Sequence, residues 1–261
     1  MKKNIFACFA LMISCAFAFS QTGDEKLLKL AEDRTAFYGT DFKGTYSIVQ
    51  KIPGEGERRT DAVMYRRDSE KKWTILVTGP AHEKGKGYLQ FDGKIWFYDP
   101  VDKRFTFSSA KDKFQNSNVT NSDFAPQKYY SDYNIAAASD ALLGSYKCRM
   151  FVLKAKNSSA EYPEVHIWVS VDDGLVRKKE DYSLSGQVLR TTGVQSFQIV
   201  KNGSVEYAVP AKMVVVDGLK GKKISGKIQY ERTQVTISNV SFSKAADSVY
   251  SKPYLEMMSA K

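Results

Sequence analysis

The stretch that decides the fold reads Tyr88-Leu89-Gln90-Phe91-Asp92-Gly93-Lys94-Ile95-Trp96-Phe97-Tyr98-Asp99. Asp-Gly is the residue pair favoured by a two-residue hairpin turn, because both central positions of that turn need positive φ. The aromatic and β-branched residues on either side favour strands. The stretch therefore predicts a β-hairpin with strands over residues 88–91 and 94–99.

Similar apolar runs recur on both sides of this hairpin, separated by turn formers such as Pro53-Gly54, Asn202-Gly203 and Asp217-Gly218. The further predicted strands are 42–51, 60–67, 72–78, 105–108, 147–155, 165–171, 175–183, 187–194, 196–201, 211–217, 222–231 and 233–240. Strands this close together, with almost no helix between them, predict one mainly β domain with an antiparallel sheet built of hairpins.

Three segments do not follow the strand pattern. A capping box at Thr22 to Glu25, followed by an apolar stripe, predicts an amphipathic helix over residues 24–37. Residues 109–145 are polar with scattered aromatics, and they predict a long excursion with a short helix near 136–142 that docks onto the sheet. Residues 243–261 are expected to form a C-terminal tail after a domain spanning 21–242.

The N-terminus has the features of an export signal. Lys2 and Lys3 precede an apolar run over residues 5–19, and Ala18-Phe19-Ser20 fits the small-x-small pattern of a cleavage site. We therefore expect residues 1–20 to be a signal peptide cleaved near Ser20, and the mature protein to be periplasmic. The alternative is a lipid anchor on Cys15, which lies in a loose version of a lipobox.

Composition and motifs argue against catalysis and nucleic-acid binding. The net charge of +10 falls to +8 without Lys2 and Lys3, and the basic residues are dispersed as pairs rather than gathered in a recognition element. His82, His166 and Cys148 have no partners at metal-binding or catalytic spacing. We expect no enzyme activity, no metal, no other cofactor and no nucleic-acid partner.

Several strands are apolar on both faces, notably around residues 73–77 and 95–98. One buried face would not require this, so we expect an internal apolar cavity under the helix over 24–37. Its predicted lining is Met64, Trp73, Ile75, Val77, Ile95 and Phe97. An ordinary sandwich or barrel core is the open alternative.

Arg66 is unusual because strand parity places it on the same face as Ala62 and Met64. A guanidinium at the rim of a core needs acceptors, and its five donors suit the carbonyl oxygens of a covering helix or loop. The alternative is a frayed strand end with Arg66 in water.

Together these residues resemble the outer-membrane lipoprotein-sorting family, the LolA-like periplasmic carriers, in a longer branch. Asp92-Gly93-Lys94-Ile95-Trp96-Phe97-Tyr98-Asp99-Pro100 is similar in residue type to the carriers' D-G-K-x-x-W-F-Y-x-P strand. Asp61 to Arg66 resembles their D-x-x-x-x-R strand, whose arginine bonds the lid. Arg67 stands where the classical carriers have proline, and residues 109–145 lack their apolar lid helix.

The resemblance implies a single, strongly curved antiparallel sheet that forms a half-open β-barrel, with a cavity for acyl chains and with Arg66 as lid tether. It implies a monomeric carrier or chaperone that binds the acyl chains of lipidated proteins and helps sort them to the outer membrane. Its expected partners are an inner-membrane releasing complex and an outer-membrane acceptor. The alternative functions are a non-enzymatic periplasmic sensor or scaffold of the same fold and, less favoured by the strand pattern, a small outer-membrane barrel.

Overall fold

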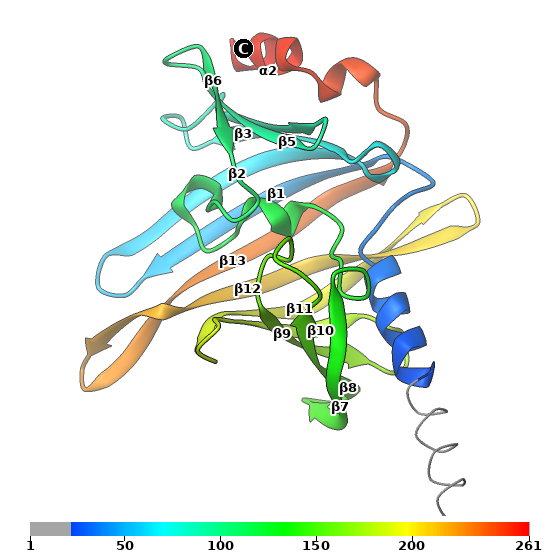
Figure 1. Ribbon diagram of the computed structural model, residues 1–261. Helices are drawn as coiled ribbons and strands as arrows, with labels where there is room; N and C mark the ends of the chain where they lie inside the picture. The colour runs from blue at the N-terminus through cyan, green and yellow to red at the C-terminus, as the bar shows by residue number, and fades with distance from the viewer. Residues whose placement is uncertain (1–21, 261) are drawn as a thin grey trace, which may run out of the picture.

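A computed structural model describes residues 22–260 of the 261-residue chain. It is mainly β, with one antiparallel sheet of 13 strands that curves strongly around its concave side (Figure 1). The strands are β1 (Phe42–Ile52), β2 (Gly56–Arg67), β3 (Lys72–Gly79), β4 (Gly87–Phe91), β5 (Lys94–Asp99), β6 (Arg104–Ser108), β7 (Tyr133–Leu143), β8 (Tyr146–Ala155), β9 (Glu164–Ser170), β10 (Val176–Tyr182), β11 (Val188–Asn202), β12 (Val205–Ile224) and β13 (Lys227–Phe242).

The order of the strands explains how the concave side is covered. The chain starts at the middle of the sheet with β1, runs outward to the edge strand β6, and resumes at the opposite edge with β7. From β7 it returns by hairpins to β13, which pairs with β1. Because β6 and β7 do not pair with each other, the sheet is not closed, and the predicted fold class is confirmed.

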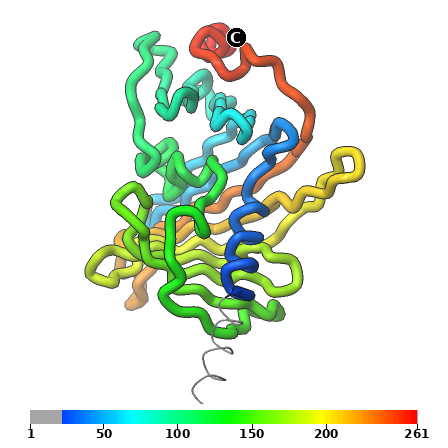
Figure 2. The backbone as a smooth tube through the Cα atoms, turned by 45° about the vertical axis from the view of Figure 1, so that its right-hand side comes forward, coloured from blue at the N-terminus to red at the C-terminus, as the bar shows by residue number. Residues whose placement is uncertain are grey.

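Residues 109–132, here called the crossover, connect the two edges. They pass in front of the sheet and carry two short 3₁₀ turns, Phe114–Asn116 and Asn121–Phe124 (Figures 1 and 2). Beside the crossover lies the N-terminal helix, which occupies residues 22–33 of the described chain and ends before the predicted limit at 37. These two segments cover the sheet as expected from the sequence.

The helix predicted near residues 136–142 is wrong, because this segment is the edge strand β7. β7 pairs with β8 on one side only, and most of its side chains are half-buried or exposed. Such a strand needs no strict alternation of polar and apolar residues, so its alanine-rich sequence did not show the period of two.

The turn predicted at Asp217-Gly218 is also wrong. These residues lie inside the long strand β12, where the pairing with β13 shifts between Val216 and Gly221. The Asp217 carboxylate accepts hydrogen bonds from the backbone amides of Leu219 and Lys220, which replace the ladder bonds lost at this bulge. The real turn lies at residues 225–226, inside the strand predicted over 222–231.

The C-terminal segment, expected to be a tail, folds back onto the outside of the sheet. It forms a 3₁₀ turn at Asp247–Tyr250 and the helix α2 (Lys252–Ser259), which lies beyond β3 and β4 at the top of Figure 1. Leu255 of α2 is buried against Leu76, Leu89 and Tyr98. The domain limits at residues 20 and 242 stay predictions, and the signal peptide with Cys15 lies outside the described residues.

Candidate functional site

Two apolar clusters lie on the concave side of the sheet. The larger cluster joins β1 to β5 and the centre of the sheet to the crossover, through Phe114, Val119 and Phe124. The smaller one joins the N-terminal helix to β7, β8 and β9, through Leu28 and Ala31. The sheet therefore has two packed halves beneath its cover.

A cavity of about 160 Å³ lies where the two halves meet, and residues of both clusters line it. Ala31 comes from the helix side, Phe124 and Tyr129 come from the crossover, and apolar side chains of the central strands form the floor. The floor comprises Phe42, Tyr46, Val176, Val194, Phe197, Ala208, Val209, Met213, Val215, Val235 and Ile237.

The structure places the six predicted cavity residues elsewhere. Met64, Trp73, Ile75 and Val77 belong to the packed larger cluster, Ile95 and Phe97 pack against it, and none of the six lines the cavity. Ile95 also lines a more polar pocket. Strands β3 to β5 are apolar on both faces, and on the outer face Leu76, Leu89 and Tyr98 pack against Leu255 of α2, which accounts for the second apolar face.

Arg66 lies at the cavity wall, and its side chain joins three segments. It donates hydrogen bonds to the carbonyl oxygen of Thr35, just after the N-terminal helix, at 2.5 Å, and to that of Phe124 in the crossover, at 3.4 Å. It also pairs with the buried Asp68, whose carboxylate accepts a bond from the amide of Phe37. The side chain is buried and bonds both parts of the cover; its role as a tether stays a prediction.

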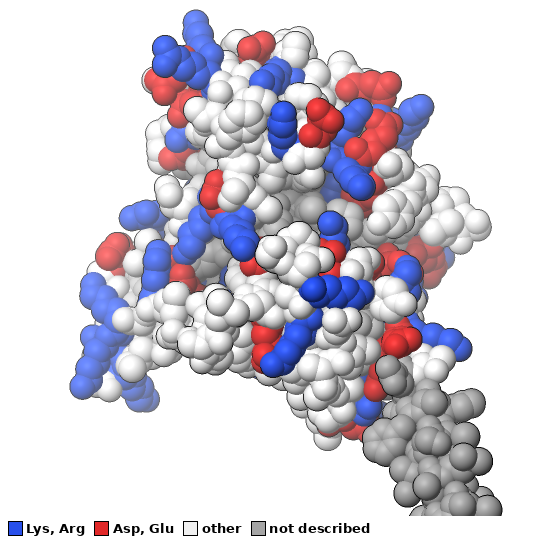
Figure 3. Space-filling model, viewed as in Figure 1, with Lys and Arg blue, Asp and Glu red and all other residues white. Residues whose placement is uncertain are grey.

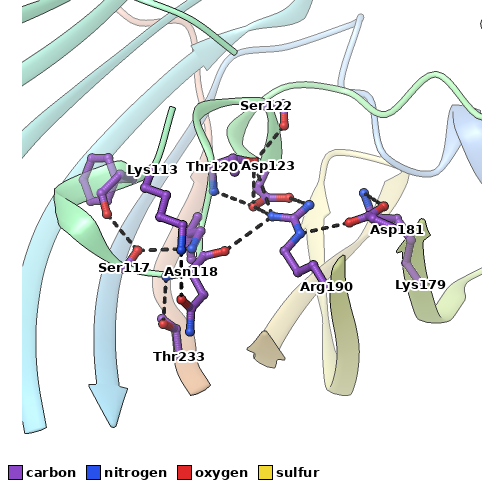
Figure 4. A network of polar contacts seen from close by, with 12 residues as sticks. Lys113, Ser117, Asn118, Thr120, Ser122, Asp123, Lys179, Asp181, Arg190 and Thr233 are labelled. Atoms are coloured by element: carbon purple, nitrogen blue, oxygen red, sulfur yellow. Dashed lines mark hydrogen bonds and ion pairs between the residues drawn. The ribbon is translucent and has the colours of Figure 1, made fainter. Parts of the chain in front are cut away.

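A second buried arginine, Arg190 of β11, bonds the crossover at Asp123 (Figure 4). Its guanidinium holds the Asp123 carboxylate at 2.6 and 3.1 Å and the fully buried Asp181 at 2.9 Å. Lys179 pairs with the other oxygen of Asp181 at 3.0 Å. Burial alone would lower the pKa of Arg190, but the two carboxylates outweigh it and raise this pKa well above its ordinary value.

Further polar contacts attach the crossover to the middle of the sheet. The amide of Asn118 donates to the hydroxyl of Thr233 at 3.0 Å, and Lys113 pairs with Asp217 at 2.9 Å (Figure 4). The Gln50 side chain reaches the carbonyl oxygen of Asn116 at 3.1 Å. The cover is thus held both by apolar packing and by side-chain hydrogen bonds to individual strands.

The Arg190 network is hard to recognise from the amino-acid sequence. Along β10 the buried side chains are Arg177, Lys179 and Asp181, whereas Val176 and Lys178 are half-buried. An alternation of charged residues ordinarily indicates the wet face of a strand. The signal that could have identified the site is charge complementarity between Arg190 and two aspartates in neighbouring segments.

The side chains around the cavity suit the binding of a mainly apolar ligand. The cavity is mostly apolar, with Lys178, Lys179 and Asp123 at its wall. Cys148 is buried, and this burial raises the pKa of its thiol, which keeps it in the unreactive protonated form. Among residues 22–260, no group of three or more His, Cys, Asp or Glu side chains could hold a metal ion. In the same part of the chain, no helix has the length and apolar character needed to cross a membrane.

Arg67, the residue that replaces proline of the classical carriers, secures the C-terminal segment. It holds Asp41 at 2.9 and 2.8 Å, and it also bonds the carbonyl oxygen of Ala245 at 2.8 Å and Asp247 at 2.6 Å. The departure from the carriers' pattern therefore coincides with a contact between β2 and the segment leading to α2.

Three solved structures share this fold. A LolA superfamily protein from Nitrosomonas europaea is 22% identical, with a TM-score of 0.70, and the match covers 88% of this chain and 97% of that one. A protein domain from Vibrio parahaemolyticus, described as outer-membrane lipoprotein-sorting, is 16% identical, with a TM-score of 0.71 and coverage of 89% and 97%. A DUF1329 family protein from Desulfovibrio piger is 15% identical, with a TM-score of 0.74 and coverage of 88% and 98%.

No curated protein sequence matches the chain. Residues 69–257 match the model of a family described only as "-like: Uncharacterized protein". This match and the three structures confirm the resemblance drawn from residues 61–66 and 92–100. The chain therefore belongs to the family of this model, and its fold is that of the LolA-like outer-membrane lipoprotein-sorting proteins.

Proposed function

We propose that this protein is a periplasmic carrier or chaperone that binds the acyl chains of lipoproteins in its central cavity and helps sort them to the outer membrane. The observation that carries the proposal is an apolar cavity under a cover that two buried arginines, Arg66 of β2 and Arg190 of β11, bond from different strands. Burial of acyl chains there would be favourable by about 0.8 kcal/mol for each methylene.

The size of the cavity supports a cover that moves. Sites for drug-sized ligands usually measure roughly 300–1,000 Å³, whereas this cavity measures about 160 Å³. Cargo therefore needs the crossover or the N-terminal helix to shift outward. The polar contacts of the cover suit this movement, because water can replace the lost partners of carbonyls and carboxylates.

The charged side chains at the wall of the cavity suit the polar end of an acylated cargo. Lys178, Lys179 and Asp123 lie beside the apolar floor. An amphiphile could place its acyl chains on that floor and its polar linkage against these side chains. A fully apolar ligand would leave the charged wall without new partners.

Mass spectrometry of the purified protein tests the proposal. Under non-denaturing conditions we expect masses of bound acylated species, which organic extraction should release as fatty acyl chains. A protein that carries no lipid, and that binds neither hydrophobic dye nor lipopeptide, would contradict the proposal.

A sensor or scaffold of the same fold is the second candidate. The small volume of the cavity favours it, because a scaffold need not hold lipid at all. The same measurement separates the two functions: a scaffold would purify without lipid and would still bind a lipoprotein lacking its acyl chains.

The proposed location and partners follow from the sequence and the resemblance. We expect a soluble mature protein that starts at Gln21, acts as a monomer, and exchanges cargo with an inner-membrane releasing complex and an outer-membrane acceptor. Intact-mass analysis of the exported protein checks the processing, and a diacylglyceryl group on Cys15 would overturn it.

A further inference from the structure

The tip of the β12–β13 hairpin, residues 219–230, is an exposed basic and apolar surface. This basic tip contains Lys220, Lys222, Lys223 and Lys227 and has no acidic residue. All of its residues are exposed except Ile224, which is half-buried. In Figure 3, blue side chains gather at the lower left, where Figure 1 places this hairpin beyond the body of the sheet.

Large apolar side chains stand among these lysines. Leu219 is 56% exposed, Ile228 63% and Tyr230 44%. Lys223 pairs with Ile228 and Gly221 pairs with Tyr230, so Lys223, Ile228 and Tyr230 point to the same face of the ribbon. Gly221 has no side chain, and a Cβ there would lie 2.8 Å from Ile228 and 3.0 Å from Tyr230, so both side chains spread across the hairpin.

Most of the positive charge at the tip is not neutralised within the protein. Lys220 pairs with Glu231 at 3.3 Å, but Lys222, Lys223 and Lys227 have no acidic partner in the described part of the chain. Three unpaired ammonium groups around exposed aliphatic side chains complement a surface with anionic headgroups above an acyl layer.

We propose that the basic tip docks this protein onto the surface of an anionic phospholipid membrane. Lysines would contact the headgroups while Leu219 and Ile228 enter the interface between headgroups and acyl chains. The inference goes beyond the proposed function and does not depend on what the cavity holds. Its consequence for a carrier is that loading or release would occur while the protein lies on a membrane.

Flotation with lipid vesicles tests the docking. We would use the chain from Gln21 onward, because the apolar run over residues 5–19 would itself bind lipid. Vesicles of phosphatidylglycerol and phosphatidylethanolamine should bind the protein, and phosphatidylcholine vesicles should not. Binding should fall steeply between 0.05 and 0.5 M salt, since the Debye length shrinks as salt rises.

Variants identify the surface responsible. Each lysine near an anionic bilayer contributes about 1 kcal/mol, which is about fivefold in partitioning. The triple variant Lys222→Gln, Lys223→Gln, Lys227→Gln should therefore bind anionic vesicles roughly a hundredfold more weakly.

The control Lys94→Gln, Lys103→Gln, Lys111→Gln removes the same charge from exposed positions in and beside the β5–β6 hairpin and should bind like the unaltered protein. Ile228→Ser should weaken binding and leave its salt dependence unchanged.

Three results would overturn the docking: no flotation with anionic vesicles, equal flotation of the two triple variants, or binding of acidic polypeptide without binding of vesicles. Uptake of hydrophobic dye by the same samples keeps the two proposals separate. Loss of flotation with normal dye uptake would leave the carrier function standing, and flotation without dye uptake would leave only the docking.

Discussion

Arg190 and Asp123 form a two-pronged ion pair, at 2.6 and 3.1 Å, that joins strand β11 to the crossover. Arg66 makes the corresponding connection from β2, through the carbonyl oxygens of Phe124 and Thr35. The two attachments meet the crossover at adjacent residues, and Arg66, Asp123 and Phe124 all line the cavity. The two attachments differ in one respect that experiment can use: Asp123 carries a charge that titrates, whereas backbone carbonyls do not.

Removal of the Arg66 attachment should destabilise the closed, empty protein and thereby strengthen its hold on cargo. Release of cargo lets the cover close again, and closure without these hydrogen bonds is less favourable. Arg66→Leu alone would leave Asp68 buried without its partner and would destabilise the fold. We therefore pair it with Asp68→Asn, whose side-chain oxygen still accepts from the amide of Phe37. Hydrogen bonds from a charged donor contribute about 1.5–3 kcal/mol each, so lipopeptide release should slow by tenfold or more.

Release kinetics of a fluorescent lipopeptide measure this effect. Arg59→Leu, on the exposed part of the same strand, is the matched control and should release cargo at the normal rate. Arg66→Lys should restore only part of the normal rate, because a point charge cannot reproduce the fork of the guanidinium. Unchanged release by the double variant would show that Arg66 has only a structural role.

Asp123→Asn should loosen the crossover from the side of Arg190. Arg190 keeps Asp181 as its partner, so the fold should survive the change. Hydrogen exchange of the amides over residues 118–124 should accelerate roughly tenfold to a hundredfold, as the loss of one charged pair predicts. Asp140→Asn removes an exposed carboxylate that pairs with Arg149 on the sheet edge, and it should leave these amides protected. Equal exchange in both variants would be evidence against the attachment.

Acid should open the cover only at pH values far below neutrality. Burial would raise the pKa of Asp123, but Arg190 and Lys179 outweigh it and lower this pKa below its ordinary value. Such a carboxylate stabilises the closed form fully above its unfolded pKa of about 3.9 and loses the effect as pH falls through the lower folded value. Dye uptake should therefore be constant between pH 8 and 5 and should rise only below about pH 4. A midpoint between pH 5 and 7 would show that another group controls the cover.

The helix α2 should contribute stability without affecting the cavity. Leu255 is fully buried against β3 and β4, and a Cβ on Gly87 would lie 2.6 Å from it. Leu255→Ala should lower the free energy of unfolding by about 2–5 kcal/mol in urea titrations, with dye uptake unchanged. Met257→Ala, on the exposed side of the same helix, should change it by less than about 0.5 kcal/mol. Loss of dye uptake in the folded Leu255 variant would link α2 to the cavity.

The sequence predicted the fold well because hairpin chemistry is local. Asp92-Gly93 and Asn202-Gly203 connect neighbouring strands as expected. Asp217-Gly218 is an equally good turn pair, but it lies in a bulge of β12. The pairing of β12 with β13, rather than the two residues themselves, decides the local backbone structure there. β7 was missed for a related reason: an edge strand with little buried surface need not alternate.

The site could be predicted only in part, because it depends on which face of each strand is covered. Parity correctly placed Arg66 on the inner face, and its two carbonyl partners lie in the expected segments. Parity could not reveal that α2 covers the outer face of Leu76 and Leu89, so the apolar excess of β3 to β5 was assigned to a cavity. Nor could it show that Lys179 and Asp181 face inward, because their partner Arg190 is distant in sequence.

Photo-crosslinking tests most directly whether acyl chains enter this cavity. A lipopeptide with a photoreactive group at the end of its acyl chain would be bound, irradiated and mapped by peptide mass spectrometry. We expect adducts on residues of the cavity floor, such as Val209, Met213 and Ile237, and competition by unlabelled lipopeptide. Saturable binding with adducts confined to the exposed residues 219–230, or to the outer face around α2, would contradict a carrier that shields its cargo in the cavity.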